Sequence, residues 1–236
     1  MSQTFSVNSD VWQLIPDLEI GVITGHRQQL TDNVPVELLA QANQQALKWV
    51  TEDPISANPV VKSWRDTFQK FKTKKGAHCS VENLLKRAKQ GKAVRPINGL
   101  VDVYNSVSLE MAFPIGGFDL DKIHGHLNLL VAEQSEDFWA LGENEPEKTL
   151  VGEIIYHDDQ SVLTRCLNWR DSVSSGLTEN TQNVAFIIEN NDPQRHTDFV
   201  AAIELLQKRL ADFIELKTTS QIVNQHQPSC ELSYSA

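Results

Sequence analysis

The sequence of 236 residues has few cysteines and no long apolar run. Cys79, Cys166 and Cys230 lie far apart and form no pair with metal-ligand spacing, so they fit a reduced cytosol better than a disulfide scaffold. No apolar stretch approaches the length that crosses a bilayer. The first residues also lack the basic and then apolar order of a signal peptide. We therefore expect a soluble, cytoplasmic protein that has no membrane partner.

Several common catalytic motifs are also missing from the sequence. There is no Gly-rich loop ending in Gly-Lys-Ser/Thr, no Gly-x-Gly-x-x-Gly after a strand and no Gly-x-Ser-x-Gly elbow, which disfavours P-loop NTPases, kinases and α/β-hydrolases. His124 and His126 would share one face of a strand, but no third ligand lies nearby in the sequence. We expect neither a metal nor a cofactor.

Positive charge is scarce overall but concentrated in one segment. The chain has a net charge of -10, yet residues 62–95 contain eleven Lys and Arg against two acids. Such asymmetry is typical of a surface that contacts a polyanion. Two helices with solvated lysines would give the same pattern, so charge alone leaves both interpretations open.

The hydrophobic periodicity predicts helices, then a β-rich region, then a final helix. This order indicates an α+β fold with one continuous body over residues 1–216. A Ser-, Gln- and Thr-rich tail, 217–236, is expected to be flexible. The predicted helices cover residues 35–50, 58–71, 80–91, 98–112 and 197–216, and the predicted strands 18–26, 126–132, 137–141, 152–158, 161–169 and 183–189.

The segment 98–125 places polar groups in an apolar helix and then two glycines. Asp102 and Asn105 are three residues apart, so they share a helix face and either hold the loop that follows the helix or face a ligand. Gly116 and Gly117 can adopt positive φ and expose backbone N–H groups to a ligand, although a plain tight turn would use them equally well.

Two later segments are unusually polar. In Cys166–Ser172, an adenine base could stack on the ring of Trp169, and the guanidinium of Arg170 could bind a phosphate or carboxylate. Alternatively, Trp169 fills the core and Arg170 forms an ion pair with an acid. In 178–189, a turn precedes an apolar strand that ends in Glu189. That carboxylate could bind a hydroxyl or an amine, or it could be a surface acid.

These segments resemble the tRNA-binding and editing module, the B3/B4 domain, of the phenylalanyl-tRNA synthetase beta subunit. The resemblance covers about residues 55–190. It rests on Asn98-x-x-Val101-Asp102-x-x-Asn105, on Pro114 with Phe118-Asp119-Leu120-Asp121-Lys122, and on Thr178-Glu179-Asn180-Thr181-x-Asn183 running on to Glu189. No other synthetase domain is present, so the chain is similar to free-standing proteins that carry this module. The resemblance implies an α+β fold with a β-barrel-like or layered β core and flanking helices.

The resemblance also implies a function, and the sequence departs from it at several positions. The family's module hydrolyses tyrosine misattached to tRNA, and motif alignment places its recognition glutamate at Glu189. The histidine of the family's Pro-x-His-Ala-Phe-Asp is replaced by Gly116, and bulky Leu167–Arg170 replace a small, Gly-rich stretch. The later His-Thr-Asp-Ala segment has no properly spaced match. The residues that form the family's tyrosine pocket are therefore not all present in this sequence.

Two functional hypotheses follow. In the first, the protein is a trans-editing deacylase of mischarged aminoacyl-tRNA. In the second, the pocket binds RNA or a free amino acid or its analogue without chemistry. The candidate catalytic residues are Glu189, Gly116 and Gly117, and the candidate substrate- or RNA-binding residues are Asn105, Phe118, Asn168, Trp169, Arg170, Lys72, Lys74, Lys75, Lys86, Arg87 and Arg95.

Overall fold

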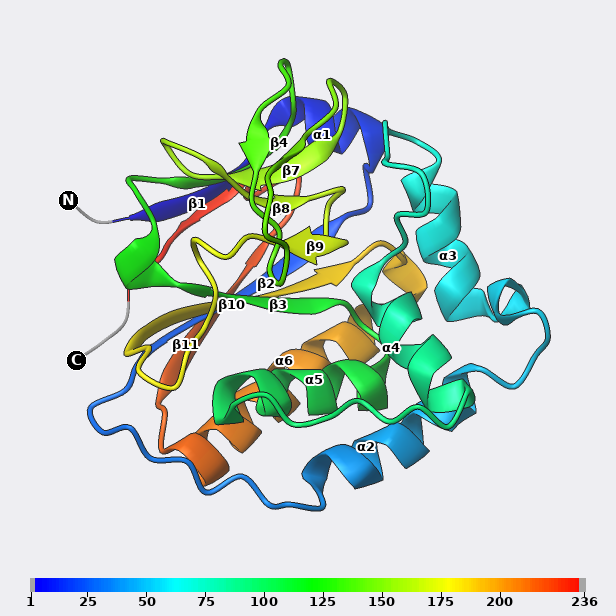
Figure 1. The fold of residues 1–236 in the computed structure, drawn as a ribbon, viewed down its shortest axis with the longest axis vertical. Helices are drawn as coiled ribbons and strands as arrows, with labels where there is room; N and C mark the ends of the chain where they lie inside the picture. Colours follow the sequence, from blue (N-terminus) through cyan, green and yellow to red (C-terminus); the bar gives the residue numbers. More distant parts are fainter. Residues whose placement is uncertain (1–2, 234–236) are drawn as a thin grey trace.

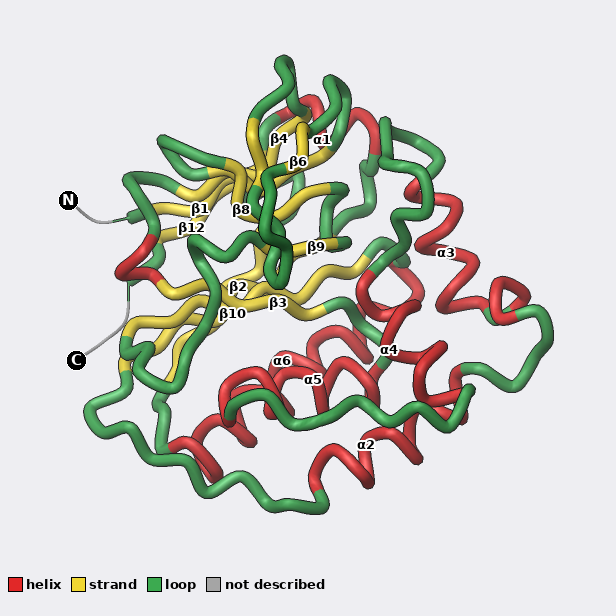
Figure 2. The backbone as a smooth tube through the Cα atoms, viewed as in Figure 1, coloured by secondary structure: helices red, strands yellow, loops and turns green. Residues whose placement is uncertain are grey.

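A computed structural model describes residues 3–233 as stacked layers of sheet and helix. Figures 1 and 2 show a larger sheet above a smaller one, with α5 and α6 beneath the smaller sheet and α2 beyond them. The α+β fold with a layered β core is thus confirmed. In this part of the chain the helices are α1 (Ser9–Leu14), α2 (Leu38–Ala46), α3 (Pro59–Phe68), α4 (Ser80–Lys89), α5 (Gly99–Met111) and α6 (His196–Ile214), with short 3₁₀ turns η1 (Leu47–Trp49), η2 (Ile55–Ala57), η3 (Leu120–Lys122) and η4 (Pro193–Arg195).

The strands form two main sheets and a short ribbon within residues 3–233. One sheet has the order β12-β1-β4-β7-β8-β9, the other β11-β2-β10-β3, and β5 pairs with β6. Their bounds are β1 (Thr4–Val7), β2 (Glu19–His26), β3 (Ile115–Asp119), β4 (Leu127–Val131), β5 (Asp137–Phe138), β6 (Glu147–Lys148), β7 (Ile154–His157), β8 (Val162–Arg165), β9 (Arg170–Asp171), β10 (Asn183–Asn190), β11 (Thr218–Val223) and β12 (Ser229–Glu231).

Strand β10 separates two hydrophobic clusters by simple alternation. Val184, Phe186 and Ile188 pack with α5 and α6, whereas Ala185 and Ile187 belong to the cluster shared with the larger sheet. Successive side chains of a strand point to opposite faces. Glu189 therefore points away from the helices and toward the larger sheet, where it sets a carboxylate among apolar neighbours.

Helix α5 begins and ends as its sequence indicates. The Asn98 side chain accepts a hydrogen bond from the Val101 N–H, and Asp102 accepts one from the Ile97 N–H at 2.8 Å. An Asn at the N-cap satisfies a helix N–H that has no carbonyl partner. The α5 prediction is confirmed, but Asp102 holds the segment that precedes the helix and not the loop that follows it, because its carboxylate lies in the first turn of the helix.

Several predicted boundaries are wrong, for identifiable reasons. The predicted strand 161–169 ends at Arg165, because Cys166 and Leu167 adopt positive φ values of 49° and 62° and turn the chain. Helix α6 begins at His196, so Thr197 lies inside the helix rather than at its cap. Ser80 is the first residue of α4 and not its N-cap, which is Cys79.

The expectation of a flexible tail from residue 217 is contradicted over its described part, which ends at Ser233. Strand β11 pairs with β2 over Thr218 to Val223, and β12 pairs with β1. Val223 is fully buried in the core between the sheets. β11 is an antiparallel edge strand with polar side chains on its exposed face, so its composition alone does not indicate a strand. Residues 234–236 of the predicted tail lie outside the described residues.

Candidate functional site

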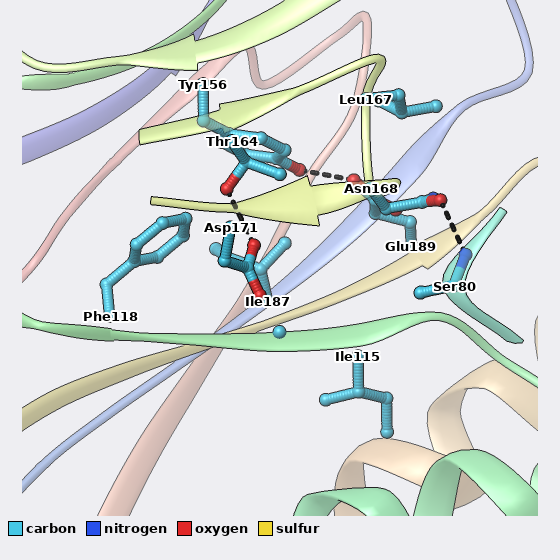
Figure 3. Close-up of a pocket in the computed structure, with 11 residues that line it drawn as sticks. Ser80, Ile115, Phe118, Tyr156, Thr164, Leu167, Asn168, Asp171, Ile187 and Glu189 are labelled. Atoms are coloured by element: carbon cyan, nitrogen blue, oxygen red, sulfur yellow. Dashed lines mark hydrogen bonds between the residues drawn. The ribbon is translucent and has the colours of Figure 1, made fainter. Parts of the chain in front are cut away.

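A small pocket lies between the two main sheets and contains Glu189 (Figure 3). Its cavity volume is about 40 Å³. Strands of both sheets, the turn after β8 and the first residue of α4 contribute to it. The lining residues are Ser80, Ile115, Gly116, Phe118, Tyr156, Thr164, Leu167, Asn168, Asp171, Ile187 and Glu189.

Glu189 is the central polar group of the pocket and is only 2% exposed. Its Oε1 accepts a hydrogen bond of 2.5 Å from the Tyr156 hydroxyl, and its Oε2 accepts one from Asn168 Nδ2. Burial, with a smaller contribution from the nearby Asp171, raises the pKa of Glu189 from 4.5 to about 7, against the opposing effect of these two hydrogen bonds. A carboxyl group with such a pKa exchanges protons near neutral pH.

The residues that the sequence analysis missed come from three adjacent strands. Tyr156 of β7 is opposite Thr164 of β8, and Thr164 is opposite Asp171 of β9. The Thr164 hydroxyl donates to Asp171 Oδ1 at 2.9 Å. Burial raises the pKa of Asp171 above its ordinary value. A Tyr, a Thr and an Asp in separate short strands carry no joint sequence signal, because only strand pairing aligns them.

The expectation of a turn at Gly116 and Gly117 is contradicted, since both glycines lie inside β3. The pairing begins with the Glu189 N–H donating to the Pro114 carbonyl at 3.2 Å, and Gly116 is opposite Ile187. Because hydrogen-bonded pairs alternate along antiparallel strands, the Gly116 N–H points to β10 rather than into the pocket. Gly116 instead contributes space: a methyl group built there meets no atom within 4 Å.

Gly117 faces the opposite side of β3. A methyl group there would lie 2.5 Å from Leu177 Cδ1 and 3.2 Å from Phe186 Cδ1. Gly117 is therefore packed against the cluster on the helical side. Of the two candidate glycines, the structure places only Gly116 beside Glu189.

Asn168 and Phe118 lie in the pocket, whereas Trp169 and Arg170 do not line it. Asn168 joins Glu189 to α4, since its Oδ1 accepts a hydrogen bond from the Ser80 N–H at 3.3 Å. Three cations surround the Trp169 ring, with Lys74 Nζ at 5.8 Å and the guanidinium carbons of Arg165 and Arg170 at 5.7 and 5.4 Å from its centroid. Arg170 also pairs with Glu143 at 3.0 Å.

The other polar motif residues lie outside the lining of the pocket. Asn105 is 8% exposed on α5 and is not one of the pocket residues. Thr181 donates a hydrogen bond to Asp119 Oδ2 at 2.8 Å, and Asn183 donates to Asp121 at 2.6 Å. The two motif segments 118–122 and 178–183 thus fasten β3 to the turn before β10, which fixes the registration of the strands that border the pocket.

The basic segment, residues 62–95, reaches the pocket at Ser80. Lys72, Lys75, Lys86, Arg87 and Arg95 are exposed, whereas Lys74 is half-buried and pairs with Glu147 at 2.5 Å. Helix α4 begins at the pocket residue Ser80 and carries Lys86 and Arg87 in its last turn. At 1.5 Å per residue, these cations lie about 10 Å along the helix from the pocket.

Across residues 3–233 no group of three or more His, Cys, Asp or Glu side chains is arranged to hold a metal ion. In the same part of the chain, none of the helices has both the length and the apolar character that crossing a membrane requires.

Comparison with known proteins places this geometry in a family context. Residues 63–218 match the B3/4 domain. The chain is similar to the phenylalanine–tRNA ligase beta subunit of Pectobacterium atrosepticum, with 35% identity over 91 residues, and to that of Neisseria meningitidis, with 26% identity over 172 residues. These matches cover 39% and 72% of this chain but only 11% and 18% of the relatives, so the chain corresponds to a small part of them.

A solved structure shows the same fold. An N-terminal fragment of the phenylalanyl-tRNA synthetase beta subunit from Pyrococcus horikoshii superposes with a TM-score of 0.51 at 13% sequence identity. The superposition covers 94% of this chain and 54% of that fragment. The resemblance that the sequence motifs indicated is therefore confirmed at the level of family and fold.

Proposed function

Because this chain belongs to the B3/4 domain family, we propose that it binds aminoacyl-tRNA and hydrolyses the ester that joins the amino acid to the tRNA. The basic segment contacts the phosphates of the tRNA, and the aminoacyl group enters the pocket that contains Glu189. The observation that carries the proposal is the position of α4, which links the two. Its first residue lines the pocket and its last turn presents exposed cations.

The chemistry requires little machinery, since the ester of an aminoacyl-tRNA is already activated. A cavity of about 40 Å³ has room for a water molecule. Glu189, with a pKa of about 7, takes a proton from that water as its oxygen attacks the ester carbonyl. The ester C–O bond then breaks, Glu189 passes this proton to the departing ribose oxygen, and a free amino acid is released.

The proposal is tested by measuring amino acid release from one tRNA charged with different amino acids. Glu189→Gln removes the proton acceptor, so we expect release to slow at least about tenfold, equivalent to ~1.4 kcal/mol of activation free energy. Glu179→Gln is the matched control, because Glu179 is an exposed acid in the turn before β10. Absence of release from every charged tRNA would overturn the hydrolytic role.

A second candidate function is binding without hydrolysis. It is favoured by the hydrogen bonds from Tyr156 and Asn168, which use both Glu189 oxygens. Gel shifts with uncharged tRNA separate this candidate from the first. A salt-sensitive shift without any release of amino acid would support it, since affinity that depends on phosphate contacts falls steeply with salt.

A further inference from the structure

Tyr156 occupies the part of the pocket next to Glu189 and is held there from three sides. It is 2% exposed, and its ring centroid lies 6.1 Å from that of Phe5 and 5.7 Å from that of Phe118. Its hydroxyl donates to Glu189 at 2.5 Å. A buried aromatic ring with neighbours on both sides and a hydrogen-bonded tip has little freedom to move aside.

The space that remains beside Tyr156 is small. The cavity of about 40 Å³ accommodates roughly three water-sized groups. The open side of Gly116 borders this space, since no atom lies within 4 Å of a methyl group built there. A ligand with a phenyl or phenol ring therefore does not fit while Tyr156 is in place, whereas a methyl or hydroxymethyl side chain does.

The polar character of the pocket selects a hydrogen-bond donor. Each oxygen of Glu189 already accepts one hydrogen bond and keeps one lone pair for the reacting water, whereas Oδ2 of Asp171 accepts none from the described residues. The pocket lining contains two carboxylates and no Lys, Arg or His. A small cation with N–H donors matches this combination, and a ligand carboxylate, which would be the third in the pocket, does not.

We propose that Tyr156 and Asp171 determine specificity, so that the pocket admits an aminoacyl group with a small side chain and a free α-ammonium and excludes aromatic amino acids. This inference rests on the proposed function and names its substrate class. Tyr156 sets the size limit, and Asp171 binds the ammonium group. The position beside Glu189 at which a hydroxyl of the ligand could bind is filled by the phenolic hydroxyl of Tyr156.

The test is a binding measurement that does not depend on hydrolysis. The full-length protein is titrated with alaninamide, tyrosinamide and N-acetylalaninamide while the amide resonances of the pocket residues Gly116 and Ile187 are followed by NMR. We expect alaninamide to shift these resonances and to bind at least about tenfold more tightly than either of the others. Tyrosinamide exceeds the space, and N-acetylalaninamide lacks the ammonium.

Variants separate the two parts of the inference. Tyr156→Ala should let tyrosinamide bind, whereas Tyr156→Phe keeps the ring and should still exclude it. Asp171→Asn should weaken alaninamide at least about tenfold. No shift with alaninamide, or equal binding of tyrosinamide by the unmodified protein, would overturn the inference. Amino acid release from charged tRNA is scored separately, so failure of the proposed function is recognised independently.

Discussion

The phenolic hydroxyl of Tyr156 donates a 2.5 Å hydrogen bond to Oε1 of Glu189 in a site where both side chains are 2% exposed. The two residues come from different sheets, so this bond joins the layers of the fold at the pocket. This bond also lowers the pKa of Glu189 by favouring the ionised carboxylate, although burial is the larger effect and raises the pKa.

Removal of the phenolic hydroxyl should therefore cost stability. Tyr156→Phe leaves a buried carboxylate oxygen without its donor, and we expect the free energy of unfolding to fall by about 1–3 kcal/mol. Tyr104→Phe is the control, because Tyr104 packs edge-on to Phe186 at 6.2 Å and its hydroxyl makes no hydrogen bond with the residues described. Urea denaturation measures both variants, and equal effects would contradict the role assigned to the Tyr156 bond.

Stability should decrease as pH rises toward neutrality because of Glu189. Its pKa is raised from 4.5 to about 7 in the folded protein. Between these values the folded state keeps a proton that the unfolded state has lost, so stability falls with increasing pH, by up to about 3 kcal/mol over the window. The Glu189→Gln variant has no titratable group at this position, so it lacks this contribution to the pH dependence.

The check is urea denaturation of both proteins on either side of this window. The difference in unfolding free energy between the original protein and Glu189→Gln should shift with pH, which cancels the titration of all other groups. A difference that stays constant across the window would show that Glu189 titrates at its ordinary value.

Filling the pocket from Gly116 should abolish ligand entry without unfolding the protein. A side chain at Gly116 extends into open space, and valine suits a strand, so Gly116→Val should change the unfolding free energy by less than about 1 kcal/mol. Its release of amino acid from charged tRNA should fall at least about tenfold.

Gly117→Val is the contrasting variant of the same strand. Its side chain would meet Leu177 and Phe186, and we expect a loss of about 1–3 kcal/mol from overpacking. Thermal unfolding distinguishes the two. If Gly116→Val released amino acid at the original rate, the pocket would not be the site of the reaction.

Charge reversal on α4 should weaken tRNA binding and reduce its salt dependence. Lys86→Glu with Arg87→Glu removes two exposed cations near the pocket, so the slope of log affinity against log salt should become shallower by about two. The control is the double variant Lys208→Glu with Lys217→Glu, which changes the net charge by the same amount at exposed positions outside the basic segment. Gel shifts over a salt series should show that the control pair keeps the original slope.

The C-terminal strands should be essential for stability. A chain that ends at Leu216 loses β11, which pairs with β2 along six residues, and β12, which pairs with β1. The edges of both sheets and part of their shared core would then be exposed, so we expect a large fall in the unfolding temperature by circular dichroism. An unchanged unfolding temperature would mean that these strands contribute nothing to the fold.

Much of the fold could be predicted because its signals are local. Asn98 caps α5, and the apolar spacing of 197–216 gives α6 to within two residues. The continuous apolar run within 183–189 predicts β10 with Glu189 near its end. The short β1 and β12 and the polar β11 escaped prediction, because each becomes a strand only through its partner.

By itself, the sequence determined the fold class, the family, the basic segment and Glu189 as the acid at the end of a buried strand. Only the tertiary structure decided what surrounds that acid. It aligned Tyr156, Thr164 and Asp171 across three strands, turned Gly116 toward the pocket and Gly117 away from it, and enclosed Trp169 among cations. The physical reason is that register and face depend on pairing between segments distant in the chain, which no local pattern specifies.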